Sequence, residues 1–216
     1  MTAPVAIPSD LLQTSFVVFD YAAVVVFGAT GALAAARRGH DIVTFAFFSA
    51  ATGVGGGTVR DLLIGAPVFW VHQPGYLAAC LAAAVMVWLF GERPAGYRLL
   101  LWLDAVGMAA YTVVGAAKAE SYGVSPAVSV VMGVITATFG GIVRDVLAGE
   151  PSVLLRREIY VTAALLGAAA FAVVQALHLS TPWPAVIGFV VGLGVRSAAL
   201  RFDLALPGFK GRGAQP

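Results

Sequence analysis

The stretch Gly53-Val-Gly-Gly-Gly-Thr-Val-Arg-Asp61 returns later in the chain as Thr138-Phe-Gly-Gly-Ile-Val-Arg-Asp145. Each copy lies inside a long apolar segment, so a glycine pair and an Arg-Asp pair are embedded in it. Consecutive glycines lower helix stability by up to about 1 kcal/mol each relative to alanine. We therefore expect a kink or a broken turn in the helix that carries each motif.

The two motifs belong to a longer repeat, because the sequence superposes on itself after a shift of 84 positions, without a gap, from residue 20 to residue 160. Chance matching of apolar residues would align alanine and valine, but not glycine, arginine, aspartate, proline and tyrosine together. The matched pairs are Asp20 with Asp104, Gly31 with Gly115, Gly39 with Gly123, Thr52 with Thr136, Gly56-Gly57 with Gly140-Gly141, Arg60-Asp61 with Arg144-Asp145, Gly65 with Gly149, Pro67 with Pro151 and Tyr76 with Tyr160.

The composition of the 216-residue chain predicts an integral membrane protein. Charged residues are 11%, against about 25% in typical soluble domains. Hydrophobic residues reach 60% and the mean hydropathy is +0.90. Too few polar side chains are present to cover a soluble surface, which excludes disorder, a nucleic-acid-binding arm and an ordinary cytosolic enzyme.

Seven apolar segments are expected to form membrane helices, since each is continuously apolar where a membrane barrel would alternate. Each repeat holds three of them, and an odd number makes the second copy enter the membrane upside down. The sequence therefore predicts an all-α membrane protein with an inverted 3+3 repeat and one extra C-terminal helix, an organisation that transport proteins use. The segments are 14–36, 42–66 and 75–91 in the first repeat (14–91), 99–117, 126–149 and 159–178 in the second (99–178), and 183–200 as the seventh.

Basic residues predict the orientation, because loops rich in lysine and arginine stay in the cytoplasm. One side of the predicted bundle carries ten of them and the other side only Lys118. We expect the N-terminus outside and the C-terminus in the cytoplasm, in the cell (inner) membrane. The ten are Arg37, Arg38, Arg93, Arg98, Arg156, Arg157, Arg196, Arg201, Lys210 and Arg212.

The glycines and two threonines are candidates for lining a polar path at mid-membrane. Backbone groups freed from a helix are tolerated in hydrocarbon only against protein or a water-filled cavity. Their carbonyl oxygens would suit a weakly held, partly dehydrated cation. The alternative is that the glycines only allow close packing between helices. The candidates are Thr52, Gly55, Gly56, Gly57, Thr136, Gly140 and Gly141.

Six ionisable residues inside the predicted spans are candidate pore groups, because charge inside a membrane is costly. Depth along the helices predicts two pairs, Asp20 with Arg60 and Asp104 with Arg144. Neighbours such as Arg60 and Asp61 point in different directions on a helix, so each is expected to need its own partner. Whether the pairs serve the pore or only lock helices together stays open. The six are Asp20, Arg60, Asp61, Asp104, Arg144 and Asp145.

Other chemistry has little support in the sequence. The lone Cys80 allows neither a disulfide framework nor a cysteine metal cluster, and no ligand spacing surrounds the three histidines. No nucleophile–base arrangement occurs, so we expect no catalytic residue, no metal, no cofactor and no nucleic-acid partner. Lys118, beside Glu120, is interpreted as a solvated charge at a helix end.

The seven segments and the doubled glycine–Arg-Asp motif resemble the prokaryotic branch of the trimeric intracellular cation channels, over roughly residues 14–200. Related sequences are also labelled glycine transporters. The resemblance implies a homotrimer in which each subunit has its own pore for monovalent cations, chiefly potassium. It places the helix kinks at the glycines of the second and fifth spans. Phe139 stands where the first repeat has Gly55, so the two halves of the pore need not be equally wide.

Three functions follow from these observations. The first is a potassium-permeable channel embedded in the lipid bilayer. The second is a secondary transporter for a small solute such as glycine, and the third is a structural or regulatory membrane protein. Inverted repeats and broken helices serve both channels and transporters, so the sequence separates the first two poorly.

Overall fold

The computed structural model describes residues 9–90, 96–153, 158–180 and 182–207. Within these ranges the long elements are all helices, and the one strand-like pairing is a single bridge between Glu158 and Ala205. The prediction of an all-α chain is therefore confirmed. The helices described are α1 (Ser9–Arg37), α2 (Ile42–Leu63), α3 (Phe69–His72), α4 (Gly75–Phe90), α5 (Gly96–Ser121), α6 (Pro126–Leu147), α7 (Val161–Ala176) and α8 (Trp183–Phe202).

Each of the seven predicted segments coincides with one long helix, and the four-residue α3 is the addition. Five helices, α1, α2, α5, α6 and α8, are long and apolar enough to cross a membrane. The other two, α4 and α7, have 16 residues each, which is about 24 Å of helix at 1.5 Å per residue. The predicted span 159–178 agrees with α7 to within two residues at each end.

The chain turns sharply after α2 and again after α6, and a glycine makes each turn. Gly65 has a φ of +69° and Gly149 a φ of +63°, a conformation that glycine adopts without the steric cost of a side chain. Both follow directly on a helix end, where such a residue closes the helix. The two glycines lie 84 positions apart, so the backbone conformation of the turn explains why glycine recurs at this place in the repeat.

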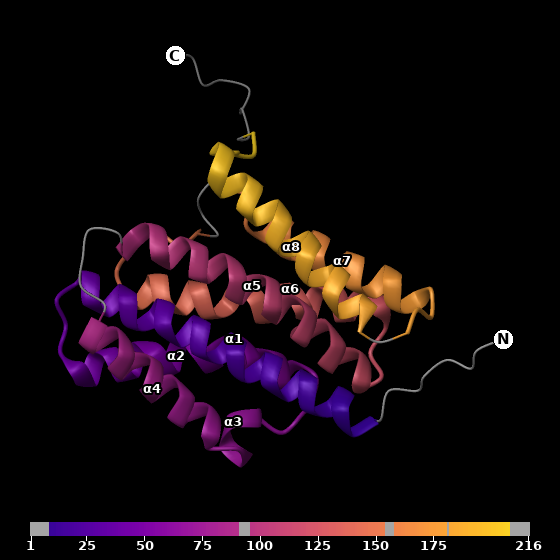
Figure 1. Cartoon of the computed structure of the whole chain (residues 1–216), viewed down its shortest axis with the longest axis horizontal. Coiled ribbons are helices and arrows are strands. Elements are labelled where there is room, and N and C mark those ends of the chain that lie inside the picture. The colour runs from indigo at the N-terminus through magenta and orange to yellow at the C-terminus, as the bar shows by residue number, and fades with distance from the viewer. Residues whose placement is uncertain (1–8, 91–95, 154–157, 181, 208–216) are drawn as a thin grey trace.

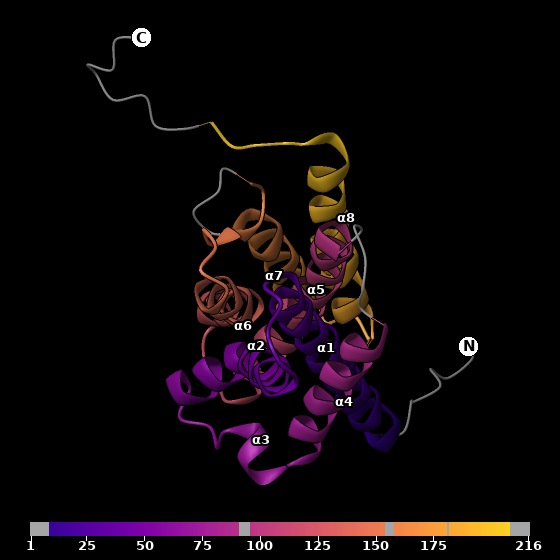
Figure 2. The same ribbon diagram turned by 90° about the vertical axis from the view of Figure 1, so that its left-hand side faces the viewer.

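Helices α1, α2, α5 and α6 form the centre of the bundle (Figure 1). Helix α4 packs on α1 and α2, while α7 packs on α5 and α6 and α8 on α5 and α7. The end view in Figure 2 shows α3 and α4 on one side of this centre and α7 and α8 on the other. In α5, 72% of the apolar window is buried, against 22% in α8, so α5 is central and α8 peripheral.

The core is built mainly from small side chains, which let the helix backbones approach closely. Alanines from most of the long helices are fully buried in it. Three arginines, Arg60, Arg144 and Arg196, are nonetheless among its largest buried side chains, each about 1% exposed. A buried guanidinium is costly without a partner, so the surroundings of these arginines locate the polar interior of the molecule.

Candidate functional site

Helices α2 and α6 cross in direct backbone contact at their glycines. A Cβ atom added to Gly56 would overlap the carbonyl oxygen of Thr136, and one added to Gly140 would overlap that of Thr52. Both helices run unbroken through their glycine motifs. The predicted broken turn is therefore absent from both helices, because close packing of α2 on α6 offsets the intrinsic weakness of the glycines. A kink at the glycines, the other form expected there, stays a prediction. The alternative expectation, that glycine permits close packing, describes Gly56 and Gly140.

The remaining candidates of the glycine motifs have different surroundings. Gly55 has only Val143 and Gly140 nearby, about 4 Å from an added Cβ, whereas Gly57 faces the ring of Phe69. Gly141 has three polar groups around it, from the second of two charged clusters described below.

The two threonines at the crossing are both buried but differ in their hydrogen bonds. The Thr136 hydroxyl donates to the Met132 carbonyl at 2.6 Å, while the Thr52 hydroxyl has no partner. Whether any of these residues lines a pore is not decided by these contacts and stays a prediction.

One carbonyl of the first glycine motif is bound by a tyrosine that sequence reasoning missed. The hydroxyl of Tyr111, on α5, donates to the carbonyl oxygen of Gly53 at 2.7 Å. The ring of Tyr111 stacks on Phe27 of α1 with centroids 5.2 Å apart. Phe27 and Tyr111 are 84 positions apart, so the repeat itself was a signal that two aromatic rings meet at the centre.

The first charged cluster consists of Asp20, Arg60, Asp61, Tyr76 and Lys118. Arg60 folds back on its neighbour, with Nε and Nη2 at 2.9 and 2.8 Å from Asp61 Oδ1. Lys118 of α5 reaches the same carboxylate, with Nζ 2.8 Å from Oδ1 and 2.9 Å from Oδ2. Asp20 instead accepts a hydrogen bond from the Tyr76 hydroxyl at 2.9 Å.

These contacts correct three predictions. Asp20 and Arg60 form no ion pair within 4.0 Å among the residues described, since Asp20 is bound by Tyr76. Arg60 and Asp61 pair with each other, because the long arginine side chain can turn back along the helix. Lys118 is not a solvated end charge: its side chain is 26% exposed and is paired with the fully buried Asp61.

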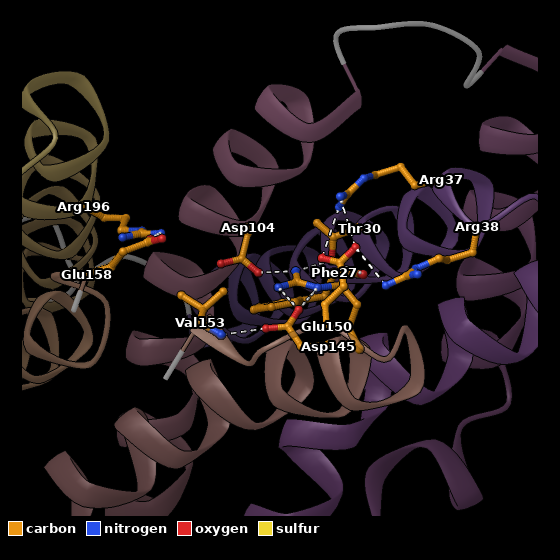
Figure 3. A network of polar contacts seen from close by, with 11 residues as sticks. Phe27, Thr30, Arg37, Arg38, Asp104, Asp145, Glu150, Val153, Glu158 and Arg196 are labelled. Carbon is orange, nitrogen blue, oxygen red and sulfur yellow. Dashed lines mark hydrogen bonds and ion pairs between the residues drawn. The ribbon is translucent and has the colours of Figure 1, made fainter. Parts of the chain in front are cut away.

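The second charged cluster consists of Thr30, Asp104, Arg144, Asp145 and Tyr160. Figure 3 labels Thr30, Asp104 and Asp145 of this cluster. Arg144 forms the predicted ion pair with Asp104, and its Nε donates to Asp145 at 2.9 Å. It also donates to the Thr30 hydroxyl at 3.3 Å. The hydroxyl of Tyr160 has no hydrogen-bond partner.

A shared backbone contact shows that the two clusters are copies of one design. The Phe69 amide donates to Asp61 Oδ2 at 3.0 Å, and the Val153 amide donates to Asp145 Oδ2 at 2.8 Å. Donor and acceptor are both displaced by 84 positions between these two bonds. In each copy the aspartate of the Arg-Asp pair therefore anchors the loop that follows its helix.

The space beside the clusters differs greatly. The first cluster borders a half-open cavity of about 680 Å³, which Asp20 and Lys118 line together with residues of α5, α7 and α8. The pocket beside Arg144 and Asp145 has about 10 Å³, hardly enough for one water molecule. The first cluster therefore borders a sizeable cavity, whereas the pocket at Arg144 and Asp145 is narrow. A separate cavity of about 620 Å³ lies on α5 and α8, where Leu101, Trp102 and Leu200 are among its lining residues.

Two further ion-pair groups lie near the second cluster and were not predicted from the sequence (Figure 3). Glu150 lies 3.1 Å from Arg37 and 3.7 Å from Arg38 at the end of α1. Buried Arg196 of α8 contacts Glu158 at 2.7 Å and lies over the ring of Tyr160 at 5.1 Å. Within the described ranges, no three histidine, cysteine, aspartate or glutamate side chains come together as metal ligands would.

Comparison with known sequences gives the chain a family. The family model described as "Glycine transporter" matches twice, at residues 17–92 and 101–176, two ranges that are themselves 84 positions apart. An inner membrane protein of Escherichia coli K12, UPF0126 protein YadS, is 37% identical over 88% of this chain and 94% of its own length. A UPF0126 membrane protein of Vibrio cholerae is 36% identical over 92% of this chain and 84% of its own.

Solved structures agree with this assignment. A trimeric intracellular cation channel orthologue from Rhodobacter sphaeroides is 48% identical, covers 89% of this chain and all of its own, and superposes with a TM-score of 0.86. A second prokaryotic channel of this kind is 26% identical, with a TM-score of 0.82 over 90% of this chain and all of its own. The apolar helices and the membrane relatives make this a multi-pass membrane protein. The chain thus belongs to the family of the prokaryotic trimeric intracellular cation channels, whose members are also described as glycine transporters.

Proposed function

We propose that the protein is a passive channel for monovalent cations, permeable to potassium, and that it works as a homotrimer with a pathway inside each subunit. The observation that carries the proposal is the match to a cation channel at 48% identity, over 89% of this chain. The path runs along the α2–α6 pair, between the first and the second charged cluster. In the second cluster the two carboxylates of Asp104 and Asp145 outnumber the one cation, Arg144, and an excess of negative charge favours cations over anions.

The two repeats are inverted relative to one another in this proposal. Support comes from the crossing of α2 and α6, where Gly56 meets Thr136 while Gly140 meets Thr52. Such reciprocal contacts, in which each copy presents the same patch, are those of a two-fold axis. With three helices in each copy, a two-fold axis in the membrane plane places the clusters at opposite faces.

The N-terminus outside and the C-terminus in the cytoplasm complete the proposed arrangement. In it the first charged cluster lies in the outer half of the membrane and the second in the inner half. Arg37, Arg38, Arg98 and Arg201 all belong to the proposed cytoplasmic side. Five of the other basic residues used to predict this orientation, Arg93, Arg156, Arg157, Lys210 and Arg212, lie outside the described residues. The tenth, Arg196, does not count toward it, because its side chain on α8 is buried and paired with Glu158.

Conduction requires movement at the glycine crossing. Because the backbones of α2 and α6 touch at Gly56 and Gly140, a hydrated ion has no room between them in this arrangement. Parting the two helices there would uncover the carbonyls of Thr52 and Thr136, together with the Thr52 hydroxyl. These are oxygen groups of the kind that replace water around a permeating cation.

The second candidate is a secondary transporter for a small solute such as glycine. The observation that favours it is the cavity of about 680 Å³ beside the first cluster, against about 10 Å³ at Arg144 and Asp145 in the second, which suits alternating access to a central site. The same closed crossing would then separate the two faces during transport.

Flux measurements in proteoliposomes separate the candidates. For a channel we expect passive potassium efflux that does not saturate with concentration and no accumulation of labelled glycine. Glycine uptake that saturates, is stimulated by counter-flow and occurs without potassium efflux would support the transporter and contradict the channel. If protein of native fold supports neither flux, the proposal fails and a structural role is left.

A further inference from the structure

The aspartate of each charged cluster contacts a different partner. In the first cluster Asp20 accepts from Tyr76 at 2.9 Å, and Arg60 Nη1 has no partner. In the second cluster Asp104 is paired with Arg144. The Tyr160 hydroxyl lies beside Asp104 and interacts with it, but not at the geometry of a full hydrogen bond. In the first cluster the tyrosine binds the aspartate, and one nitrogen of the arginine is left without a partner. In the second cluster the arginine binds the aspartate, and the tyrosine hydroxyl is the group left without a full hydrogen bond.

The unbound groups are well placed to serve as alternative partners. Arg60 and Tyr160 are each 1% exposed, and a buried donor without an acceptor carries a desolvation cost. Around Gly141, the Tyr160 hydroxyl, Asp104 Oδ1 and Arg144 Nη2 all lie within 3.6 Å of the position of an added Cβ. Tyr160 is thus beside the aspartate that its counterpart, Tyr76, binds in the first cluster. The second oxygen of Asp104 is also buried and unbound.

The partner of the aspartate correlates with access to the cluster. Where the aspartate is bound by tyrosine, the cluster opens to a cavity of about 680 Å³ lined by that aspartate. Where it is bound by arginine, the pocket beside the arginine has about 10 Å³. An ion pair between Asp104 of α5 and Arg144 of α6 holds those two helices together, whereas Asp20 of α1 has no such bond to α2.

We propose that each aspartate exchanges between tyrosine and arginine, and that the exchange opens and closes its end of the ion pathway. Tyr76 and Tyr160 are the positioning residues of this exchange, each holding the aspartate away from the arginine in the open arrangement. The first repeat has the tyrosine-bound arrangement and the second repeat has the arginine-bound arrangement. Both therefore occur in one molecule, as expected for conformations that differ in free energy by a few kcal/mol. The inference rests on the proposed function, since it assigns the regulation of that pathway.

A fixed difference between the repeats is the competing explanation. Lys118 brings a second cation to the first cluster, and the residue 84 positions earlier is Ala34. Asp104 therefore has only Arg144 to pair with, while the first cluster has two cations for two carboxylates. If this imbalance alone sets the partners, the Tyr160 hydroxyl has no role in any state.

The variant Tyr160→Phe distinguishes the two explanations. It removes a hydroxyl that makes no full hydrogen bond in this structure, so we expect the fold and the trimer to be retained. If Asp104 needs Tyr160 to leave Arg144, potassium flux falls by at least about tenfold, the scale of one hydrogen bond to a charged group. Unchanged flux in Tyr160→Phe overturns the exchange.

Tyr76→Phe gives a readout that needs no ion flux. Loss of its hydroxyl frees Asp20 to pair with Arg60 and should close the cavity. A cysteine introduced by Ala117→Cys, in the cavity wall, then reacts with a charged thiol reagent about tenfold more slowly. Cys80 is fully buried, so it adds little background. Labelling at the original rate overturns the proposal, whether or not the protein conducts.

Tyr21→Phe is the matched control for both measurements. The ring of Tyr21 stacks on Tyr76 with centroids 4.0 Å apart, yet its hydroxyl makes no hydrogen bond with Asp20. The exchange predicts that this variant labels and conducts like the unmodified chain. A tenfold change here would show that any lost hydroxyl at this place perturbs the cavity, which also overturns the specific role of Tyr76.

Discussion

The first and second charged clusters are built from residues 84 positions apart, but they balance charge differently. In the first, Arg60 and Lys118 face Asp20 and Asp61, so the formal charges cancel. In the second, Arg144 alone serves both Asp104 and Asp145, and it donates a further hydrogen bond to the Thr30 hydroxyl. The comparison teaches that a repeated sequence fixes the positions of charges without fixing which of them pair.

Removing the arginine of each cluster should have unequal effects, and this is the largest difference that we expect. Arg144→Ala leaves Asp104 and Asp145 without an ion-pair partner, and should lower the free energy of unfolding by about 3–5 kcal/mol. Arg60→Ala should cost roughly half as much, because Asp61 keeps Lys118 and Asp20 keeps Tyr76. Unfolding in lipid nanodiscs measures both. Equal losses would mean that the two clusters are energetically equivalent.

The glycine crossing should respond equally in both repeats, in contrast to the clusters. Gly56→Ala and Gly140→Ala each push a Cβ atom into a backbone carbonyl of the other helix, and should cost about 1–3 kcal/mol of unfolding free energy through overpacking. Gly55→Ala is the control on the same helix, because an added Cβ there meets nothing closer than 3.9 Å. It should be neutral or stabilising by up to about 1 kcal/mol. A stability loss in Gly55→Ala that matches Gly56→Ala would contradict the packing argument.

The tyrosine at the centre tests whether the two-fold relation extends to single hydrogen bonds. Tyr111→Phe loses the bond to the Gly53 carbonyl and should cost about 0.5–1.5 kcal/mol of unfolding free energy. Phe27→Tyr places a hydroxyl at the related position, towards the carbonyl of Ala137, 84 positions after Gly53. Thermal unfolding should show a smaller loss for Phe27→Tyr than for Tyr111→Phe. A larger loss would mean that the hydroxyl is buried there without an acceptor.

Lys118 should contribute least to stability, although it changes the charge balance. Its side chain is partly exposed, and such pairs contribute about 0.2–1 kcal/mol. Lys118→Ala should therefore change the free energy of unfolding by less than about 1 kcal/mol, with Lys118→Arg as the control that keeps the charge. If Lys118→Ala is as damaging as Arg144→Ala, then Lys118 and not Arg60 is the main counter-charge of Asp61.

The helices could be predicted from the sequence because apolar length is a property of neighbouring residues. Each of the seven predicted segments corresponds to a helix in the structure. The short α3 was missed because four residues are too few to show a periodic pattern. The contact between Asp104 and Arg144 was also predictable, because the two residues lie at similar depths in the membrane along their predicted helices. Depth alone failed for Asp20 and Arg60, because it ignores competing partners such as Tyr76.

The residues missed at the site depend on tertiary contacts that spacing does not reveal. Lys118 reaches Asp61 from another helix, at a distance of 57 positions in the chain. Tyr111 reaches Gly53 over 58 positions. The neighbouring sequence does not distinguish Lys118 from an ordinary charge at a helix end, or Tyr111 from an ordinary buried aromatic residue. The glycines were predicted to weaken their helices, but packing between α2 and α6 could not be weighed without the partner helix.

Single-channel recording of the purified protein in planar bilayers tests the central claim most directly. With a potassium gradient across the bilayer, a cation pathway in each subunit predicts discrete unitary currents that reverse near the potassium equilibrium potential. Up to three equal conductance levels are expected from one homotrimer. Protein of native fold that gives no unitary current, or currents that reverse at the equilibrium potential of the anion, would contradict the account.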